Sequence, residues 1–200
     1  FMTTWLKGVD RDRLTPEQRG DAGTAISRLR ALMASPLALY AIASLALNLS
    51  FAQVEASFVL VLRDYLGFGA IETGWLFTYI GVCIIIVQAV LIKTVVSRFG
   101  EVTTILIGAS LLALGQIVTV LIVMGLFVGN AYPLAQTLLG TTAICFGFAL
   151  STPAITAAVS KIAGETMRGG SLGMIQGFGS LGQVIGPVSY THLTLPTIVD

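Results

Sequence analysis

Five runs of apolar residues, separated by short polar segments, constrain the fold of this chain more than any other feature. They cover residues 37–62, 74–92, 102–128, 138–160 and 172–188. A helix needs roughly 20 residues to cross a hydrocarbon core about 30 Å thick, and the first four runs reach about that length. None of them shows the period-two alternation of a membrane β-strand. The runs therefore predict an all-α, polytopic membrane helix bundle of five spans, the fifth of them truncated.

Composition agrees with a membrane protein and argues against several other classes. Hydrophobic residues make up 55% of the chain and charged residues only 10%, whereas a soluble domain carries about 25% charge. The net charge of +1 comes without a basic patch interleaved with aromatic residues, so we expect no nucleic-acid partner. The sequence also lacks a phosphate-binding GxxxxGK[ST] loop, an HExxH or GxSxG motif and a cluster of metal ligands. We therefore expect no enzyme activity, no cofactor and no metal.

The basic residues lie almost entirely on one side of the predicted spans. Ten of the eleven lysines and arginines precede the first run or follow the second or the fourth, and only Arg63 follows the first. Because lysine and arginine concentrate in cytoplasmic loops, we expect a multi-pass protein of the cell inner or plasma membrane with residues 1–35 on the cytoplasmic side. Within residues 1–35, helical spacing of apolar residues over 24–33 predicts a short amphipathic helix on the membrane surface. A solvated linker helix is an equal alternative.

Glu55 is the only ionisable residue well inside an apolar run. A charge at the bilayer centre costs about 2.5–3.5 kcal/mol on insertion scales, and such groups usually face a cavity. We expect Glu55 to exchange the proton or to contact a cationic substrate, with Asn48 on the same helical face. The alternative is a structural polar group near the outer interface, since Glu55 lies about 27 Å beyond Leu37 along a helix.

Glutamines provide the remaining long polar side chains of the spans. Three of them are further candidates to line a substrate cavity: Gln53, Gln88 and Gln176. Amides of this kind equally well form hydrogen bonds between helices.

The fifth run is rich in glycine. Gly173 and Gly177 form one pair at four-residue spacing, Gly182 and Gly186 form another, and Pro187 follows. Glycine lets two helix backbones approach closely in lipid, and glycine with proline makes a helix easier to bend. We interpret this segment as a gating helix that slides against its neighbour, with static close packing as the alternative.

Two stretches of the sequence resemble a known transporter family, the major facilitator superfamily. Residues 168–187 are similar to the loop and eleventh helix of its drug–proton antiporters. Residues 97–101 are similar to the loop motif between its helices eight and nine, where Arg98 and Gly100 match the pattern. The acidic residue before the arginine and the basic residue after the glycine are absent, which weakens a role for this loop as a gate.

The resemblance covers residues 1–188 and implies the second half of such a transporter, roughly helices seven to eleven. It implies proton-coupled efflux of small amphipathic compounds by alternating access. The implied partners are the lipid bilayer, a small-molecule substrate, protons and the N-terminal half of the same protein. Two alternatives stay open: an importer or metabolite exporter of the same superfamily, and a structural membrane protein without a substrate path.

The last part of the chain has a resemblance of a different kind. Val188 to Thr197 is similar to a transposase-type sequencing adapter translated in one frame. This implies that residues 188–200 are an artefact, that the fifth span ends prematurely, and that His192 takes no part in the chemistry. A natural C-terminal tail is the alternative.

Overall fold

The computed structural model describes residues 35–124 and 133–194, together with residues 27 and 30. The chain divides into two compact units, residues 1–38 and 39–200. The amphipathic helix that we expect in the first unit lies outside the described residues, apart from 27 and 30, which are helical. The second unit holds nearly all of the described helices.

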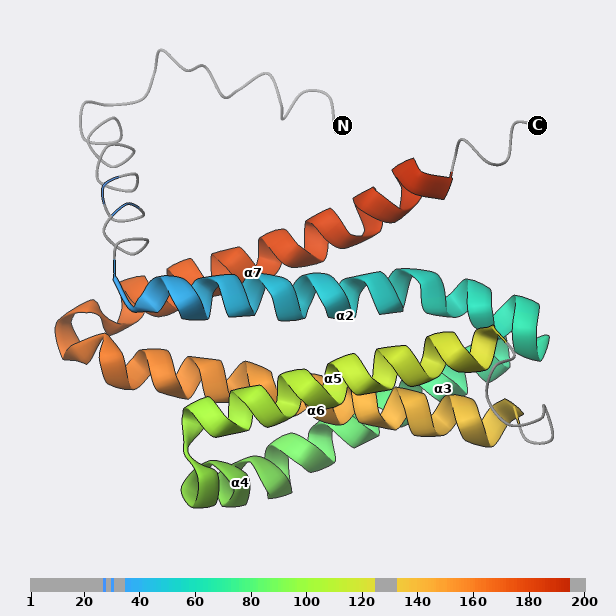
Figure 1. Cartoon of the computed structure of the whole chain (residues 1–200), viewed down its shortest axis with the longest axis horizontal. Helices are drawn as coiled ribbons and strands as arrows, with labels where there is room; N and C mark the ends of the chain where they lie inside the picture. Colours follow the sequence, from blue (N-terminus) through green and yellow to red (C-terminus); the bar gives the residue numbers. More distant parts are fainter. Residues whose placement is uncertain (1–26, 28–29, 31–34, 125–132, 195–200) are drawn as a thin grey trace, which may run out of the picture. The chain divides into compact units, whose positions relative to one another are not determined.

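The described chain consists of helices joined by short turns, and these residues include no strand (Figure 1). The helices are α2 (Leu37–Leu66), α3 (Ala70–Ile86), the π-helix η3 (Val87–Leu91), α4 (Ile92–Phe99), α5 (Glu101–Val123), α6 (Pro133–Ile162) and α7 (Gly164–Thr194). The expected all-α membrane helix bundle is confirmed.

Four of the described helical segments are long and apolar enough to cross a membrane: Leu37–Asp64, Ala70–Phe99, Glu101–Val123 and Leu134–Ile162. They overlap the first four apolar runs. The fifth run lies in α7, which is 31 residues long but is not among the four, because its many glycines and its glutamines lower its hydropathy. The last residues of the third run, 125–128, lie outside the described residues.

Glycines at positive φ form the three described turns between helices. Gly67 has φ 68°, Gly100 has φ 80° and Gly164 has φ 66°, a region that other residues rarely adopt. The N–H of Gly67 donates to the carbonyl oxygen of Arg63 at 3.0 Å and so closes the end of α2. Turns this short make consecutive helices antiparallel neighbours.

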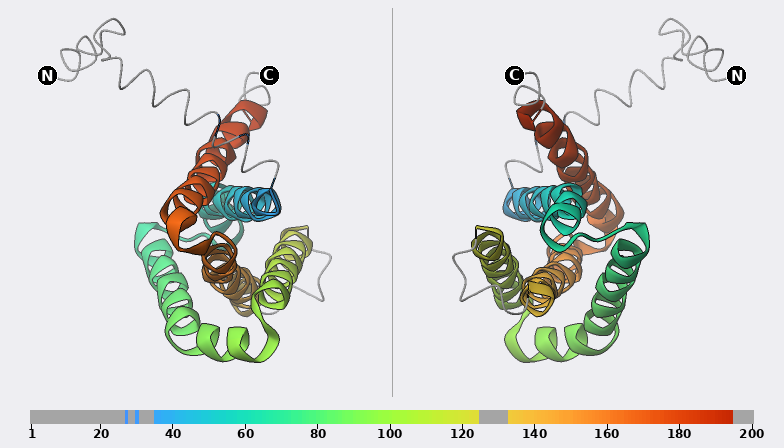
Figure 2. Two further views of the ribbon diagram at one scale, coloured as in Figure 1. Left: turned by 90° about the vertical axis from the view of Figure 1, so that its left-hand side faces the viewer. Right: turned by 90° about the vertical axis from the view of Figure 1, so that its right-hand side faces the viewer.

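Helix α6 lies at the centre of the second unit. It contacts α3, η3, α4, α5 and α7, and its Phe148 stacks on Phe51 of α2. In its most apolar stretch 56% of the residues are buried, against 17–29% in the other three candidate spans. Figure 2 shows α3, η3 and α4 curving around one side of α6, with α5 on another side.

The closest helix contact joins α5 to α6 through glycines. A Cβ atom on Gly147 would lie 2.4 Å from the backbone nitrogen of Leu112 and 2.5 Å from the carbonyl oxygen of Gly108. A Cβ atom on Gly115 would lie 2.8 Å from the backbone nitrogen of Ile144. Without side chains at these positions the two backbones come into direct contact, which maximises dispersion where lipid provides little hydrophobic force between helices.

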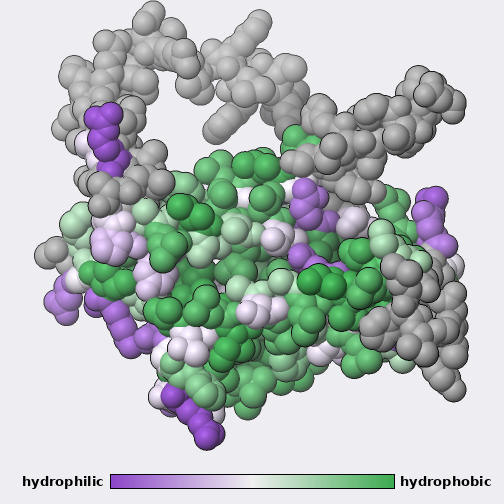
Figure 3. Space-filling view, viewed as in Figure 1, coloured by the Kyte–Doolittle hydropathy of each residue, from purple (hydrophilic) through white to green (hydrophobic). Residues whose placement is uncertain are grey.

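Most of the surface in Figure 3 is apolar, with hydrophilic residues at the ends of the helices and a few along them. At one end Lys161 of α6 pairs with Glu101 of α5, and both line an open cleft with Lys93. At the other end of the helices, Arg63 near the C-terminus of α2 forms an ion pair with Asp64. This arrangement agrees with the charge separation in the sequence, while the side of the membrane on which each end lies stays a prediction.

We expect Gly147→Ala to destabilise the protein, because the added methyl group would overlap backbone atoms of α5 that cannot move without separating the helices. Overpacking of this kind costs about 1–3 kcal/mol. The measurement is the melting temperature of the detergent-solubilised protein.

Gly74→Ala is the matched control, since a Cβ atom there would meet nothing within 4 Å and alanine favours the helix by about 1 kcal/mol. If Gly147→Ala melts as high as this control, the close α5–α6 contact is not a source of stability.

Candidate functional site

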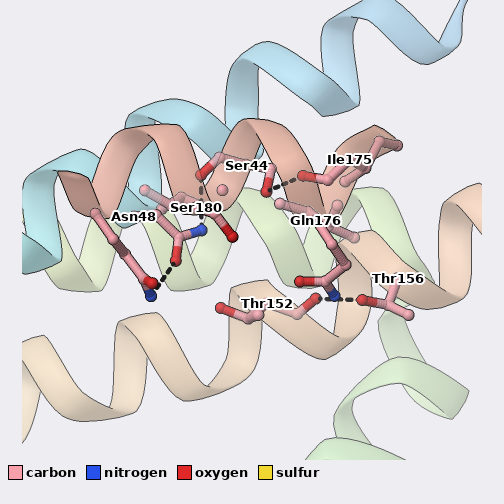
Figure 4. Close-up of a pocket in the computed structure, with 11 residues that line it drawn as sticks. Ser44, Asn48, Thr152, Thr156, Ile175, Gln176 and Ser180 are labelled. Atoms are coloured by element: carbon pink, nitrogen blue, oxygen red, sulfur yellow. Dashed lines mark hydrogen bonds between the residues drawn. The ribbon is translucent and has the colours of Figure 1, made fainter. Parts of the chain in front are cut away.

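A small polar pocket lies where α2, α6 and α7 meet (Figure 4). Its volume is about 60 Å³, which leaves room for a few water molecules but not for a substrate. The residues that line it are Ser44, Leu47, Asn48, Thr152, Ile155, Thr156, Ile175, Gln176, Gly179, Ser180 and Gln183. Hydroxyl and amide groups from three helices therefore converge on one point inside the bundle.

Hydrogen bonds across this pocket connect α2 to α7. The hydroxyl of Ser44 donates to the carbonyl oxygen of Ile175 at 3.3 Å. The Nε2 group of Gln183 donates to Oδ1 of Asn48 at 3.1 Å, and Nδ2 of Asn48 donates to the carbonyl oxygen of Ser44 at 2.8 Å. Asn48 is 8% exposed, so its amide is both a donor and an acceptor in a mostly dry setting.

Glycines of α7 bring that helix close enough to α2 for these bonds. A Cβ atom on Gly182 would lie 2.6 Å from the carbonyl oxygen of Leu45, and one on Gly186 would lie 2.9 Å from Cβ of Ala52. The earlier pair, Gly173 and Gly177, has nothing within 4 Å. Of the two glycine pairs in the sequence, only the second lies against another described helix.

A larger pocket, of about 190 Å³, lies between α2, α3 and α6. We refer to it as the aromatic pocket, and its lining residues are Phe51, Val54, Glu55, Phe58, Phe77, Ile80, Gly81, Ile84, Thr141, Ile144 and Cys145. Glu55 is the one charged member of this set, and its side chain is exposed, so it lies at the open side. Thr141 is 4% exposed, and its buried hydroxyl has no hydrogen-bond partner.

A stacked pair of phenylalanines lies between the two pockets. The rings of Phe51 and Phe148 are 4.1 Å apart at their centroids and are inclined by 16°. Along α2 the polar pocket uses residues 44–48 and the aromatic pocket uses 51–58; along the antiparallel α6 they use 152–156 and 141–145. The pair therefore separates a polar compartment from an aromatic one along the same α2–α6 contact.

Helix α2 extends well beyond Glu55. Helix α2 continues to Leu66, and the candidate span covers Leu37–Asp64. Glu55 is then only four to five residues from the midpoint of the span, about 7 Å at 1.5 Å per residue. Whether Glu55 faces a cavity or lies at the outer interface stays a prediction.

The other polar candidates lie in different parts of the structure. Asn48 and Gln176 line the polar pocket, whereas Gln88 lines an open cleft between η3, α6 and α7. Gln53 accepts a hydrogen bond at its backbone oxygen from Ser57 at 2.9 Å and lines none of these pockets. Pro187 lies inside α7, which continues to Thr194 through the first residues of the adapter-like segment.

The loop motif forms a turn in which Arg98 has no described ion-pair partner. Its guanidinium carbon lies 5.8 Å from the ring centroid of Phe99, and Gly100 supplies the positive φ between α4 and α5. The interhelix ion pair at this end instead joins Glu101 to Lys161. Glu101, which departs from the family pattern, thus forms an ion pair between α5 and α6.

Sequence reasoning missed several residues that form the site. Thr141 and the Phe51–Phe148 pair carry no motif, and Tyr79 reaches across from α3 to share a hydrogen bond of 2.6 Å with Thr142. A signal for the α5–α6 contact was nevertheless present. Gly108 and Gly115 are seven residues apart, as are Gly140 and Gly147, and this spacing places each pair on one helix face.

Comparison with known families identifies the chain. The family model described as Major Facilitator Superfamily matches residues 1–188. The chain belongs to this superfamily. It is therefore a secondary transporter embedded in the membrane as a multi-pass protein, and its family is in general not enzymatic. Neither a curated protein nor a solved structure matches the chain.

We expect the Asn48–Gln183 hydrogen bond to contribute a coupling energy of about 0.6 kcal/mol, and less than about 2 kcal/mol, to folding in a membrane environment. A double-mutant cycle of Asn48→Ala and Gln183→Ala, followed by unfolding in a denaturing detergent, measures this energy.

The control cycle combines Asn48→Ala with Gln176→Ala, because Gln176 lines the same pocket and forms no described hydrogen bond with Asn48. A coupling as large in the control cycle as in the first would show that the pocket responds as a whole and that this bond has no separate role.

Proposed function

We propose that this chain is the second half of a proton-coupled exporter of small amphipathic compounds that works by alternating access in the cell inner or plasma membrane. Residues 1–35 would lie on the cytoplasmic side, and the N-terminal half of the same protein would complete the substrate path. The observation that carries the proposal is Glu55, a carboxylate within a candidate span at the open side of an aromatic pocket.

Proton coupling rests on the isolation of Glu55. Among the described residues no cation lies within ion-pair distance of it. An unpaired carboxylate at this depth is costly when charged, so protonation or the arrival of a cation lowers its free energy. A group that can be neutralised in either way suits the exchange of a proton for a substrate.

An amphipathic substrate is favoured by the chemistry of the two pockets. The polar pocket is too small for a metabolite with many hydroxyl groups, whereas the aromatic pocket joins apolar walls to one charge. An importer or exporter of highly polar metabolites would need more hydrogen-bonding groups than the aromatic pocket supplies.

The contacts of α7 suit a helix that moves between two halves. Its C-terminal glycines lie against α2, while Gly173 and Gly177 leave an open face. In this transporter architecture the two halves rock about a site near the midplane. We propose that this open face meets the N-terminal half in one of the two states.

We expect Glu55→Gln, made in the full-length transporter that contains this chain, to reduce proton-driven efflux by at least about tenfold. The reason is that the amide can neither exchange a proton nor neutralise a cation. The measurement is substrate flux in proteoliposomes with an imposed pH gradient, together with the pH change inside the vesicles.

Asp64→Asn is the control, since Asp64 lies on the same helix but lines neither pocket and is paired with Arg63. Unchanged flux in Glu55→Gln, with an unchanged proton signal, would remove Glu55 from the mechanism.

A further inference from the structure

We infer that the open cleft between α4, α5 and α6 binds a monoanionic phospholipid, with the lipid phosphate at Lys93 and Lys161 and an acyl chain along the apolar wall between α4 and α6. We refer to this site as the basic cleft. It is separate from both pockets described above, so lipid binding there does not depend on the proposed export. Three properties of the basic cleft specify its occupant: the depth of its charged groups, their sum and the apolar wall beside them.

The charged groups of the basic cleft lie at the depth of lipid headgroups. Glu101 is the first residue of one candidate span, and Lys161 is the last but one of another. Lys93 precedes Phe99, the last residue of a third span, by about 9 Å along a helix. A lysine can extend its ammonium group toward the interface while its carbon chain stays in an apolar setting. The two ammonium groups can therefore meet a phosphate at the boundary between headgroups and hydrocarbon.

The charges of the basic cleft leave one positive charge to be neutralised. Lys161 forms an ion pair with Glu101, whereas no described carboxylate lies within ion-pair distance of Lys93. These three are the charged residues of the lining, so two cations and one anion leave a single positive charge. A phosphodiester carries one negative charge and accepts charge-assisted hydrogen bonds from lysine. The choline group of a zwitterionic lipid would add a positive charge that finds no free carboxylate there.

Apolar side chains form the wall beside these charges. Ile92 and Val96 come from α4, and Pro153 and Ala157 come from α6. Along α6, Pro153 lies about 12 Å closer to the middle of the span than Lys161 does. The wall therefore runs from the charged end toward the interior of the membrane, in the direction that an acyl chain takes from its headgroup.

The space available suits a lipid rather than a free phosphate ion. The basic cleft measures about 530 Å³, within the range of about 300–1,000 Å³ that is typical of ligand sites. It adjoins a second open cleft of about 620 Å³, and Ile92, Pro153 and Ala157 line both. An inorganic phosphate would leave these shared apolar residues uncovered, whereas an acyl chain would bury them. Basic pockets between membrane helices are also the kind of site that binds anionic headgroups.

The experiment uses the full-length transporter that contains this chain, purified in detergent, and native mass spectrometry. The probes are dioleoyl phosphatidylglycerol, dioleoyl phosphatidylcholine and glycerophosphoglycerol, which is the headgroup of the first lipid without its acyl chains. We expect phosphatidylglycerol to bind at least about fivefold more tightly than phosphatidylcholine, because each lysine near the membrane surface favours an anionic lipid by roughly this factor. The free headgroup should bind more weakly than the whole lipid, since it cannot cover the apolar wall.

Three variants assign these preferences to the basic cleft. Lys93→Gln should weaken the binding of phosphatidylglycerol about fivefold and leave that of phosphatidylcholine unchanged, which also shows that the protein is intact. Arg98→Gln is the matched control, because it removes a positive charge from the same helix at a residue that does not line the cleft. Ala157→Phe should weaken the binding of phosphatidylglycerol at least as much as Lys93→Gln does, although it changes no charge, because the larger side chain fills the cleft.

A loss confined to Lys93→Gln and Ala157→Phe would support the inference. Equal losses in Lys93→Gln and Arg98→Gln would mean that the lipid responds only to the total charge at this end, and would overturn it. An unchanged affinity in Ala157→Phe would do the same. Binding of glycerophosphoglycerol as tight as that of the whole lipid would assign the cleft to a soluble phosphate compound instead. None of these outcomes depends on whether Glu55→Gln alters transport.

Discussion

Direct backbone contact between α5 and α6 holds the centre of this bundle together. Lipid offers little hydrophobic force to press helices against one another, so dispersion between closely spaced backbones must replace it. Gly108, Gly115 and Gly147 permit this contact, and Lys161 with Glu101 holds the two helices at their charged end. Since α6 touches the remaining helices of residues 39–200, its attachment to α5 fixes a common frame for them.

The contact between α2 and α6 is of the opposite kind, because pockets interrupt it. Along this contact the polar pocket comes first, the stacked Phe51 and Phe148 rings come next, and the aromatic pocket with its one carboxylate follows. The α5–α6 pair is tightly packed, whereas α2 and α7 are joined to each other by a few hydrogen bonds and glycine contacts.

The sequence predicted the features that each helix determines by itself. Apolar length gave the helical class and four of the candidate spans, and the positions of lysine and arginine anticipated that Lys93 and Lys161 share one end. A single helix does not reveal its neighbour, however. The Phe51–Phe148 stack joins residues 97 positions apart, and the four-residue glycine spacing in α7 did not distinguish Gly182, which meets α2, from Gly177, which meets nothing. The seven-residue spacing of Gly140 and Gly147 was the more informative pattern, because it marks a helix face that stays in contact over two turns.

The π-helix η3 determines how the residues that follow it are rotated about the helix axis. A π turn accommodates one more residue than an α turn, and η3 does so where Val87 is fully buried against Ala149 and Leu150. Each residue advances an α-helix by about 100°. A chain shorter by one residue here would rotate all of α4 by that angle, so that Lys93 would no longer point into the cleft it shares with Lys161. The direction in which the charged end faces therefore depends on the number of residues before it as much as on their identity.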